Sequence, residues 1–370
     1  MIPRLALCAL LALGCSKNHP AVGDGGVTDA GPDDACSLAN EPRFDGGQSV
    51  PVEGEVLNFF DVWGTSPKDL YVSGTGGRVM RWNGTAWSRE ATPAPANPAT
   101  SGDLLGIWGS GPDAVWTVGL GGTIFYRGNG TWYSQSGPPD DGGTFTTDLH
   151  GVAGGGDVGS VWAVGSNATM IHSTDNGTSW AYVSVPTQET LNGLWIAPGG
   201  GAGAAVGNLG TILTYDGSTW QRQRVSGLTA HLKGVYGTDA TNICAAGLNG
   251  TLVCNAGGTW HRVTPTGLLP KDQECQQAVT PWPSVFLRDM WSVDGRLFVV
   301  GWSGTIGLLG GGDRATIYQV TENRLESVWG TRVIDTPGQG DGGIPDGGLV
   351  THHEVFIVGV TGTVFRVVMP

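Results

Sequence analysis

Six cysteines carry the most reactive side chains of this 370-residue chain, at positions 8, 15, 36, 244, 254 and 275. Cys244 and Cys254 lie equally far from a predicted hairpin centred on Asn249. Directly opposed residues of an antiparallel pair can be bridged, so we predict a disulfide here, with two free buried thiols as the alternative. Cys36 and Cys275 would then pair by elimination. No Cys-x-x-Cys or His pair has zinc spacing, so no structural metal is expected.

Cys15 has a different chemistry, because it ends a short export signal. Residues 1–15 read MIPRLALCALLALGC, with a positive charge at Arg4 followed by an apolar run too short to span a bilayer. The last four residues resemble the bacterial lipobox, which implies cleavage before Cys15 and acylation of its thiol. Ser16 resembles the sorting pattern for the outer membrane of Gram-negative cells. An ordinary cleaved signal that leaves a plain thiol is the alternative.

The composition separates a tether from a folded body. Residues 15–42 are mostly Gly, Asp, Ala and Pro, so we expect a disordered tether between a signal peptide at 1–14 and one domain at 43–370. The formal net charge is −13 with only 19 Lys plus Arg, so no basic stripe exists for nucleic acid. The 64 Gly, 21 Pro and 15 Trp favour an all-β fold.

Self-similarity at a period of 38 to 55 residues organises the body. Each unit opens with an apolar segment that ends in an aromatic residue, replaced once by Ala153. These aromatics are Trp63, Trp108, Trp195, Tyr236, Trp291 and Trp329. Seven openings, each followed by alternating segments and Gly-rich turns, predict an all-β, seven-bladed β-propeller with four antiparallel strands per blade.

The junction between third and fourth strands carries a family resemblance. Ser173, Asp175, Gly177 and Trp180 match the Asp-box pattern S-x-D-x-G-x-[ST]-W. The chain therefore resembles BNR-repeat propellers of the sialidase type and of the photosystem-assembly-factor type, and eroded copies occur at residues 82–87, 215–220 and 257–260. In that family the box is a structural hairpin remote from any active site, so the resemblance implies a fold rather than a chemistry.

The last unit ends after its third strand, at residues 362–368, and lacks a fourth. Residues 43–52 imitate a junction between third and fourth strands. We therefore expect the segment near residues 49–53 to close the ring as the outer strand of blade seven. Such closure removes an unpaired sheet edge.

Catalysis finds little support in these residues. The sialidase-type resemblance would imply an arginine triad, a tyrosine paired with a glutamate, and an aspartate acid/base. The Arg-Ile-Pro signature is missing after the signal, and the seven tyrosines have no recognisable partner pattern. There is no nucleophile elbow, phosphate-cradling loop or His-Glu-x-x-His. Paired carboxylates for glycoside hydrolysis would need no motif, because propeller strands bring distant residues together.

One aligned position supports binding instead. The residue after the opening apolar one varies in charge and size, whereas the next is Asp, Gly or Ser in every blade. The variable residues are Phe60, Leu105, His150, Asn192, Lys233, Arg288 and Glu326. Turns between second and third strands should reach the same mouth of the channel with Leu120, Leu209, Leu248, Trp302 and Val360. Apolar residues clustered in exposed turns indicate a contact surface, unless they tuck under neighbouring loops.

We therefore predict a non-catalytic binding or scaffolding module in the bacterial cell envelope, anchored to the outer membrane by lipid. It should be monomeric, use no cofactor and contact a protein or a glycan. The competing hypothesis is a degenerate sialidase-like glycoside hydrolase. Binding predicts a ring of apolar and polar residues at one mouth, whereas hydrolysis predicts two carboxylates about 5 to 10 Å apart there.

Overall fold

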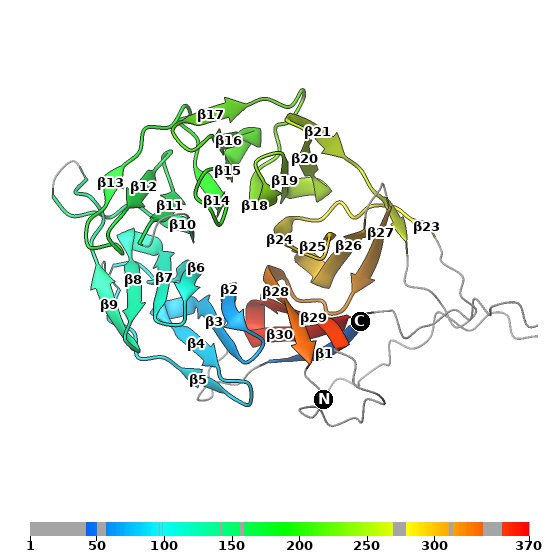
Figure 1. Cartoon of the computed structure of the whole chain (residues 1–370), viewed down its shortest axis with the longest axis horizontal. Coiled ribbons are helices and arrows are strands. Elements are labelled where there is room, and N and C mark those ends of the chain that lie inside the picture. Colours follow the sequence, from blue (N-terminus) through cyan, green and yellow to red (C-terminus); the bar gives the residue numbers. More distant parts are fainter. Residues whose placement is uncertain are drawn as a thin grey trace, which may run out of the picture. The chain divides into compact units, whose positions relative to one another are not determined.

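Seven sheets, one for each blade, stand around a central axis and form the predicted β-propeller (Figure 1). The computed structural model describes residues 42–49, 57–95, 97, 99–140, 143–155, 159–268, 279–310, 314–335 and 350–369. They all belong to one compact unit, residues 38–370. The expected signal peptide and almost all of the expected tether lie outside the described residues, as does Cys275.

Each of the first five blades has four strands in chain order, with the first strand next to the axis. Blade one has β2 (Phe59–Ser66), β3 (Asp69–Gly74), β4 (Val79–Trp82) and β5 (Trp87–Arg89). Blade two has β6 (Leu104–Gly111), β7 (Ala114–Gly119), β8 (Ile124–Gly128) and β9 (Thr131–Gln135). Blade three has β10 (Leu149–Gly154), β11 (Val161–Gly165), β12 (Met170–Ser173) and β13 (Ala181–Tyr182). Blade four has β14 (Leu191–Ile196), β15 (Gly203–Gly207), β16 (Ile212–Tyr215) and β17 (Trp220–Gln223). Blade five has β18 (Leu232–Asp239), β19 (Asn242–Gly247), β20 (Leu252–Ala256) and β21 (Thr259–Val263).

Blade six is larger than expected, because two short strands continue its sheet outward. Its four regular strands are β24 (Leu287–Val293), β25 (Arg296–Gly301), β26 (Thr305–Gly310) and β27 (Arg314–Gln319). The additional strands are β22 (Thr266–Leu268), which pairs in parallel with β27, and β23 (Val279–Thr280). They precede the blade in sequence and carry no repeat pattern, so the periodicity could not reveal them.

The ring closes in blade seven through a strand from the other end of the domain. The blade contains β28 (Leu325–Asp335), β29 (Val350–Gly359), β30 (Thr363–Met369) and β1 (Arg43–Ser49), and β1 pairs with β30. Closure by an N-terminal outer strand is therefore confirmed, but its expected position at residues 49–53 is wrong. The strand begins earlier because Phe44 packs into the core beside Tyr318, with ring centroids 4.9 Å apart.

Among the described residues, a tight 3₁₀ turn joins the second and third strands of every blade except blade three. These turns are η2 (Thr75–Gly77), η3 (Leu120–Gly122), η4 (Asn208–Gly210), η5 (Leu248–Gly250), η6 (Trp302–Gly304) and η7 (Val360–Gly362). In blade five this turn brings Cys244 and Cys254 opposite each other, and they form the predicted disulfide. The hairpin is thus fixed covalently as well as by its ladder.

A cluster of buried apolar side chains lies between every pair of neighbouring blades. Tyr71, Phe125 and Trp132 belong to the cluster between blades one and two. Phe59 and Phe356 belong to the one that joins blade seven to blade one. Side chains alternate along each strand, so each sheet packs one face on the preceding blade and the other on the following blade.

The opening aromatic residue of a blade packs against the first strand of the next blade. A Cβ atom on Gly154 would lie 2.4 Å from Cη2 of Trp108, so the indole occupies the space that a side chain at residue 154 would need. Blade three reverses this arrangement: Ala153 stands at the aromatic position, Ile196 stands where blade four would have glycine, and both belong to one core cluster. The space between these blades is filled from the opposite side.

Candidate functional site

The end of the channel where the first strands begin is here named the narrow mouth. Six of the seven predicted variable residues line a recess of about 80 Å³ there. These residues are Phe60, Leu105, Asn192, Lys233, Arg288 and Glu326. The seventh, His150, is outside this lining. Side chains fill most of the space, so the narrow mouth offers a surface for contact rather than a pocket for a ligand.

The turns between second and third strands reach the narrow mouth, as predicted. Nε2 of His150 lies 3.4 Å from Oγ of Ser166, and Nδ2 of Asn192 donates to Oδ1 of Asn208 at 3.0 Å. Each of these pairs joins the variable residue of a blade to the first turn residue of the same blade. Asn192 also donates to the carbonyl oxygen of Leu232 in the next blade, at 2.9 Å. The variable residues therefore also connect blades, which the alignment could not show.

Charged side chains gather at blades five to seven. Arg288 and Arg324 flank the buried carboxylate of Glu326, with nitrogen to oxygen distances of 2.5 and 3.4 Å. Nζ of Lys233 donates to the carbonyl oxygen of Asn192 at 3.2 Å. Burial, helped by the charge of Arg288, lowers the pKa of Lys233 to about 8. Burial also lowers the pKa of His150 to about 4, so its imidazole is neutral at pH 7.

Apolar turn residues differ in how far they are exposed. Leu209 is 54% exposed and Trp302 is 40% exposed, whereas Leu120, Leu248 and Val360 are half-buried. Leu209 has a φ of +50°, a backbone conformation that is uncommon for a side chain of this kind. Trp302 contacts the ring of Phe286 with centroids 5.7 Å apart, and the guanidinium of Arg324 lies 5.6 Å from its centroid. Two of the five predicted turn residues are therefore exposed, and the other three are partly covered.

The opposite end of the channel contains a larger recess that the sequence did not suggest, here named the wide funnel. Its volume is about 890 Å³. Its lining includes the opening aromatics of six blades, namely Trp63, Trp108, Trp195, Tyr236, Trp291 and Trp329. They occupy one strand position and therefore reach the same end of the ring. That common position was the available signal, but it was interpreted only as a marker of the repeat.

Two carboxyl groups meet between the narrow mouth and the wide funnel. Oγ of Ser327 lies 2.6 Å from Oδ1 of Asp61 and 2.7 Å from Oδ2 of Asp289. Each carboxyl group also accepts a backbone N–H from the next blade, from Ile107 to Asp61 at 2.8 Å and from Val328 to Asp289 at 3.0 Å. The sequence grouped these aspartates with small channel residues and missed the pair.

The arrangement of this pair requires a proton beyond that of Ser327. A hydroxyl group has one hydrogen, so Ser327 can donate to only one of the two carboxyl groups. The other contact is a hydrogen bond only if that carboxyl group is protonated. Burial, with the charge of Asp61, raises the pKa of Asp289 to about 7. Burial also raises the pKa of Asp61.

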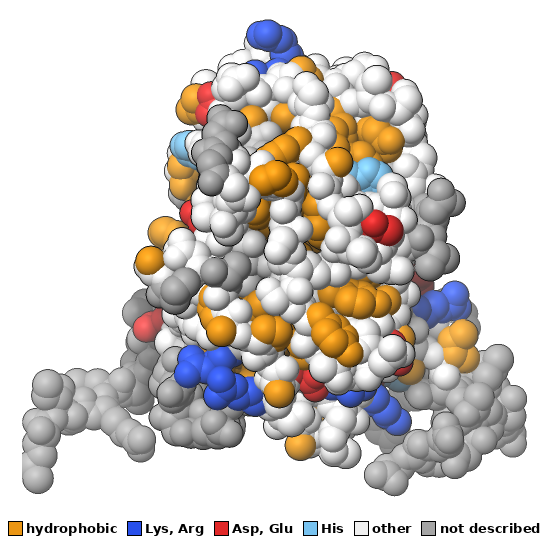
Figure 2. Space-filling view, turned by 90° about the vertical axis from the view of Figure 1, so that its left-hand side faces the viewer, with side chains coloured by type: hydrophobic (Ala, Val, Ile, Leu, Met, Phe, Trp, Pro, Cys, Tyr) orange, Lys and Arg blue, Asp and Glu red, His pale blue; other side chains and the backbone are white. Residues whose placement is uncertain are grey.

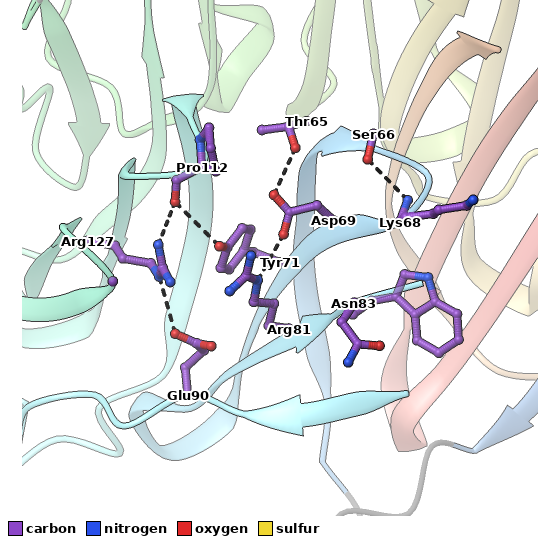
Figure 3. Close-up of polar contacts among 12 residues, drawn as sticks. Thr65, Ser66, Lys68, Asp69, Tyr71, Arg81, Asn83, Glu90, Pro112 and Arg127 are labelled. Carbon is purple, nitrogen blue, oxygen red and sulfur yellow. Dashed lines mark hydrogen bonds and ion pairs between the residues drawn. The ribbon is translucent and has the colours of Figure 1, made fainter. Parts of the chain in front are cut away.

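A second polar cluster lies between blades one and two (Figure 3). Nη1 of Arg127 donates to the carbonyl oxygen of Pro112 at 2.6 Å, and its Nε lies 3.3 Å from Glu90. The guanidinium groups of Arg81 and Arg127 lie 5.3 and 5.4 Å from the ring centroid of Tyr71. Burial raises the pKa of Tyr71 to about 12, so this phenol is no nucleophile at neutral pH. The cluster fastens two blades together.

The Asp-box residues lie on the outer side of blade three, away from the channel. Asp175 accepts hydrogen bonds from the backbone N–H and the hydroxyl of Ser179, at 2.9 and 2.7 Å, and Ser173 accepts the N–H of Gly177 at 2.7 Å. Hydrogen bonds from Ser179, and then from Ser173, lower the pKa of Asp175 to about 2. Trp180 is buried against blade two. These contacts fix a hairpin.

The outer flank of the ring has no continuous apolar surface on the side where β9 and β13 lie. Figure 2 looks onto this side and shows hydrophobic side chains in separate groups with polar atoms between them. Tyr133 and Tyr182, on these two strands, are 50% and 49% exposed.

In the described part of the chain, no helix is long and apolar enough to cross a membrane. Nor do the described residues contain three or more His, Cys, Asp or Glu side chains that could hold a metal ion together.

Comparison with solved structures agrees on the fold. A structure described as YCF48 bound to D1 peptide is 14% identical, with a TM-score of 0.59 over 88% of this chain and 96% of that chain. YCF48 from Cyanidioschyzon merolae is 15% identical, with a TM-score of 0.57 over 86% and 98%. The WD40 repeats of RRP9 are 9% identical, with a TM-score of 0.61 over 89% and 100%. No protein-family model and no curated protein matches the sequence.

Proposed function

We propose that this chain is a non-catalytic module that binds a protein partner across its narrow mouth. The observation that carries the proposal is Trp302, a large aromatic side chain that is 40% exposed on a tight turn and has Arg324 over its ring. Tryptophan and arginine are enriched at the energetic centres of protein interfaces. Leu209 is a second exposed apolar side chain at the same mouth. One propeller of the same fold has been solved with a bound peptide.

Capture of a partner tests this proposal. The full-length protein and its Trp302→Ala variant would be used to capture proteins from envelope extracts of the producing bacterium. We expect a partner that the wild type retains and the variant loses, because truncation of a central aromatic residue removes apolar contact area. Equal recovery by both proteins would place the contact elsewhere. Retention of glycans alone would assign the mouth to the other ligand class.

The proposal includes a membrane anchor at Cys15, on the resemblance of residues 12–15 to a lipobox, and an outer-membrane location. It also includes descent from BNR-repeat propellers, on the Asp-box residues of blade three. Replacing Cys15 by alanine should move the protein from the membrane fraction to the soluble fraction, because the acylated thiol is lost. Immunoblots of the two fractions measure this. A Cys15→Ala protein that stays in the membrane fraction would contradict the anchor.

Glycoside hydrolysis is the second candidate, and the pair of Asp61 and Asp289 is the observation that favours it. Two carboxyl groups of different protonation state are what such a mechanism uses. However, backbone N–H groups of the next blade already hold both of them. We therefore expect no hydrolysis of chromogenic glycosides. Turnover that the Asp289→Asn variant lacks would establish the enzyme instead.

A further inference from the structure

The wide funnel has the dimensions of a ligand site. Its volume of about 890 Å³ lies within the range of pockets that enclose small ligands or single side chains of a partner. It opens at the end where first and second strands are joined, since Ser110, Pro198 and Thr238 belong to its lining. The narrow mouth lies at the opposite end of the channel, and the two recesses meet at Asp61 and Asp289.

The charges of the wide funnel have one sign. Asp61 and Asp289 are the only charged side chains among the described residues that line it, and no Lys, Arg or His side chain occurs there. Lys233, Arg288 and Glu326 all line the other recess, where Asp61 and Asp289 also take part. The channel is therefore acidic at the floor of the funnel and has its cations on the far side. A positive group that enters the funnel meets no repulsion from its lining.

The walls of the wide funnel suit a cation as well. Six blades contribute Trp or Tyr side chains to it, and indole and phenol rings attract cations through their negative faces. Besides these rings, the lining has only three further uncharged polar side chains, Ser110, Ser160 and Thr238. A sugar needs many hydrogen-bonding partners, whereas a guanidinium group needs carboxylates and flat apolar surfaces. The lining thus favours a cation over a glycan.

We infer that the wide funnel binds an arginine side chain from a protein partner, with the guanidinium among the aromatic rings and directed to Asp61 and Asp289. Arginine fits better than lysine because its planar group stacks on aromatic rings, and its positive charge beside Asp61 and Asp289 favours loss of the proton that these two carboxyl groups share. The overall charge of −13 also favours a basic partner. The wide funnel and the narrow mouth open at opposite ends of the channel and are tested with different ligands and variants, so either proposal can fail without the other.

Peptide probes that differ only in charge test the inference. The peptide acetyl-Gly-Arg-Gly-amide and its citrulline counterpart, a neutral analogue of similar shape, would be titrated into the full-length protein. Tryptophan fluorescence and ligand-observed NMR report binding. We expect the arginine peptide to bind about tenfold more tightly than the citrulline peptide, because only arginine forms charge-assisted hydrogen bonds with the floor. A lysine peptide should fall between the two.

Asp289→Asn is the decisive variant. Asparagine keeps the shape, and its amide oxygen in the place of Oδ2 of Asp289 can accept both the N–H of Val328 and the hydroxyl of Ser327, so the blades stay connected. We expect the preference for arginine over citrulline to fall to about twofold or less, since a bound cation can then ionise only Asp61 and no longer both carboxyl groups. Glu322→Gln removes one exposed charge outside the funnel lining and should leave the preference unchanged. If Asp289→Asn unfolds, Asp61→Asn replaces it in the same measurement.

Three outcomes would overturn the inference. The first is equal binding of the arginine and citrulline peptides by the wild type. The second is an unchanged preference in the aspartate variants. The third is saturable binding of maltotriose without any preference for arginine, which would assign the wide funnel to a glycan. None of these results depends on Trp302 or on capture of a partner, so the function proposed for the narrow mouth is tested separately.

Discussion

Two tryptophans at opposite ends of blade six have different roles. Trp291, on the first strand, packs between the rings of Tyr236 and Trp329, with centroids 4.9 and 6.1 Å away. Trp302, on the turn η6, is 40% exposed and contacts Phe286 and Arg324. Six blades have an aromatic residue at the first position, whereas blade six alone has one at the second. An aromatic residue that recurs in most blades is thus one that packing of the ring requires. An aromatic residue that occurs in one blade, such as Trp302, is available for contact with a partner.

From this comparison we expect the largest losses of stability at residues that pack between neighbouring blades. Ala153→Trp should overpack against Ile196, and Ile196→Gly should leave a cavity, each lowering the free energy of unfolding by about 3 kcal/mol. The double variant recreates the arrangement of the other blades. Its loss should be smaller than the sum of the single losses by about 1 to 3 kcal/mol.

Chemical denaturation of the wild type, the two single variants and the double variant measures this coupling. Additive losses would show that the two residues do not share one space, and would contradict the account of how neighbouring blades pack.

A smaller effect on stability is expected from Asp289, which lies between the narrow mouth and the wide funnel. Burial and Asp61 raise the pKa of Asp289 to about 7 in the folded protein, above its ordinary value of 3.8. The folded state then binds more protons than the unfolded state between these two values, so stability falls as the pH rises through this window. Asp289→Asn lacks this titration.

Relative to the wild type, the Asp289→Asn variant should therefore gain stability, on the order of 1 kcal/mol, between about pH 5 and about pH 8. Melting temperatures across this range measure the difference. The opposing titration of His150, whose lowered pKa raises stability with pH, is common to both proteins and cancels. Parallel pH profiles would show that Asp289 is ionised throughout.

The smallest effect on stability is expected at the narrow mouth. Trp302→Ala should change the free energy of unfolding by about 0.5 kcal/mol or less, because much of the side chain is already exposed to water. Arg288→Ala is less suitable for this test, because it would leave the buried Glu326 with only Arg324 as a partner. A loss comparable to that of the core variants would assign Trp302 to the fold and remove it from the candidate contacts.

The fold was predictable because repetition reveals what every blade needs. The opening aromatics, the glycine turns and the equal spacing of Cys244 and Cys254 fixed seven blades and one disulfide. The start of β1 was missed because residues 43–52 were compared with a turn, whereas burial of Phe44 places the strand earlier. Gly46 allows the register shift of β1 against β30 between residues 46 and 49, since a Cβ atom on residue 46 would lie 2.7 Å from the carbonyl oxygen of Val364.

The candidate sites were only partly predictable, because alignment shows which residues share a position and not what they contact. It brought six variable residues to one recess, yet it could not show that Asn192 bonds the next blade. Grouping Asp61 and Asp289 with glycine and serine by size concealed their charge. The wide funnel escaped notice because the aromatic residues that line it also pack neighbouring blades together, and their recurrence was explained by that packing alone.

Binding by variants at the two ends of the ring tests whether the partner contacts the narrow mouth. Affinity for the captured partner would be measured by calorimetry for Trp302→Ala and Leu209→Ala at the narrow mouth. Ile334→Ala, which is 54% exposed on β28 beyond the wide funnel, is the matched control. We expect each narrow-mouth variant to weaken binding by more than about 1 kcal/mol at an unchanged melting temperature, while the control binds normally. Normal binding by both narrow-mouth variants together with a loss for Ile334→Ala would contradict it.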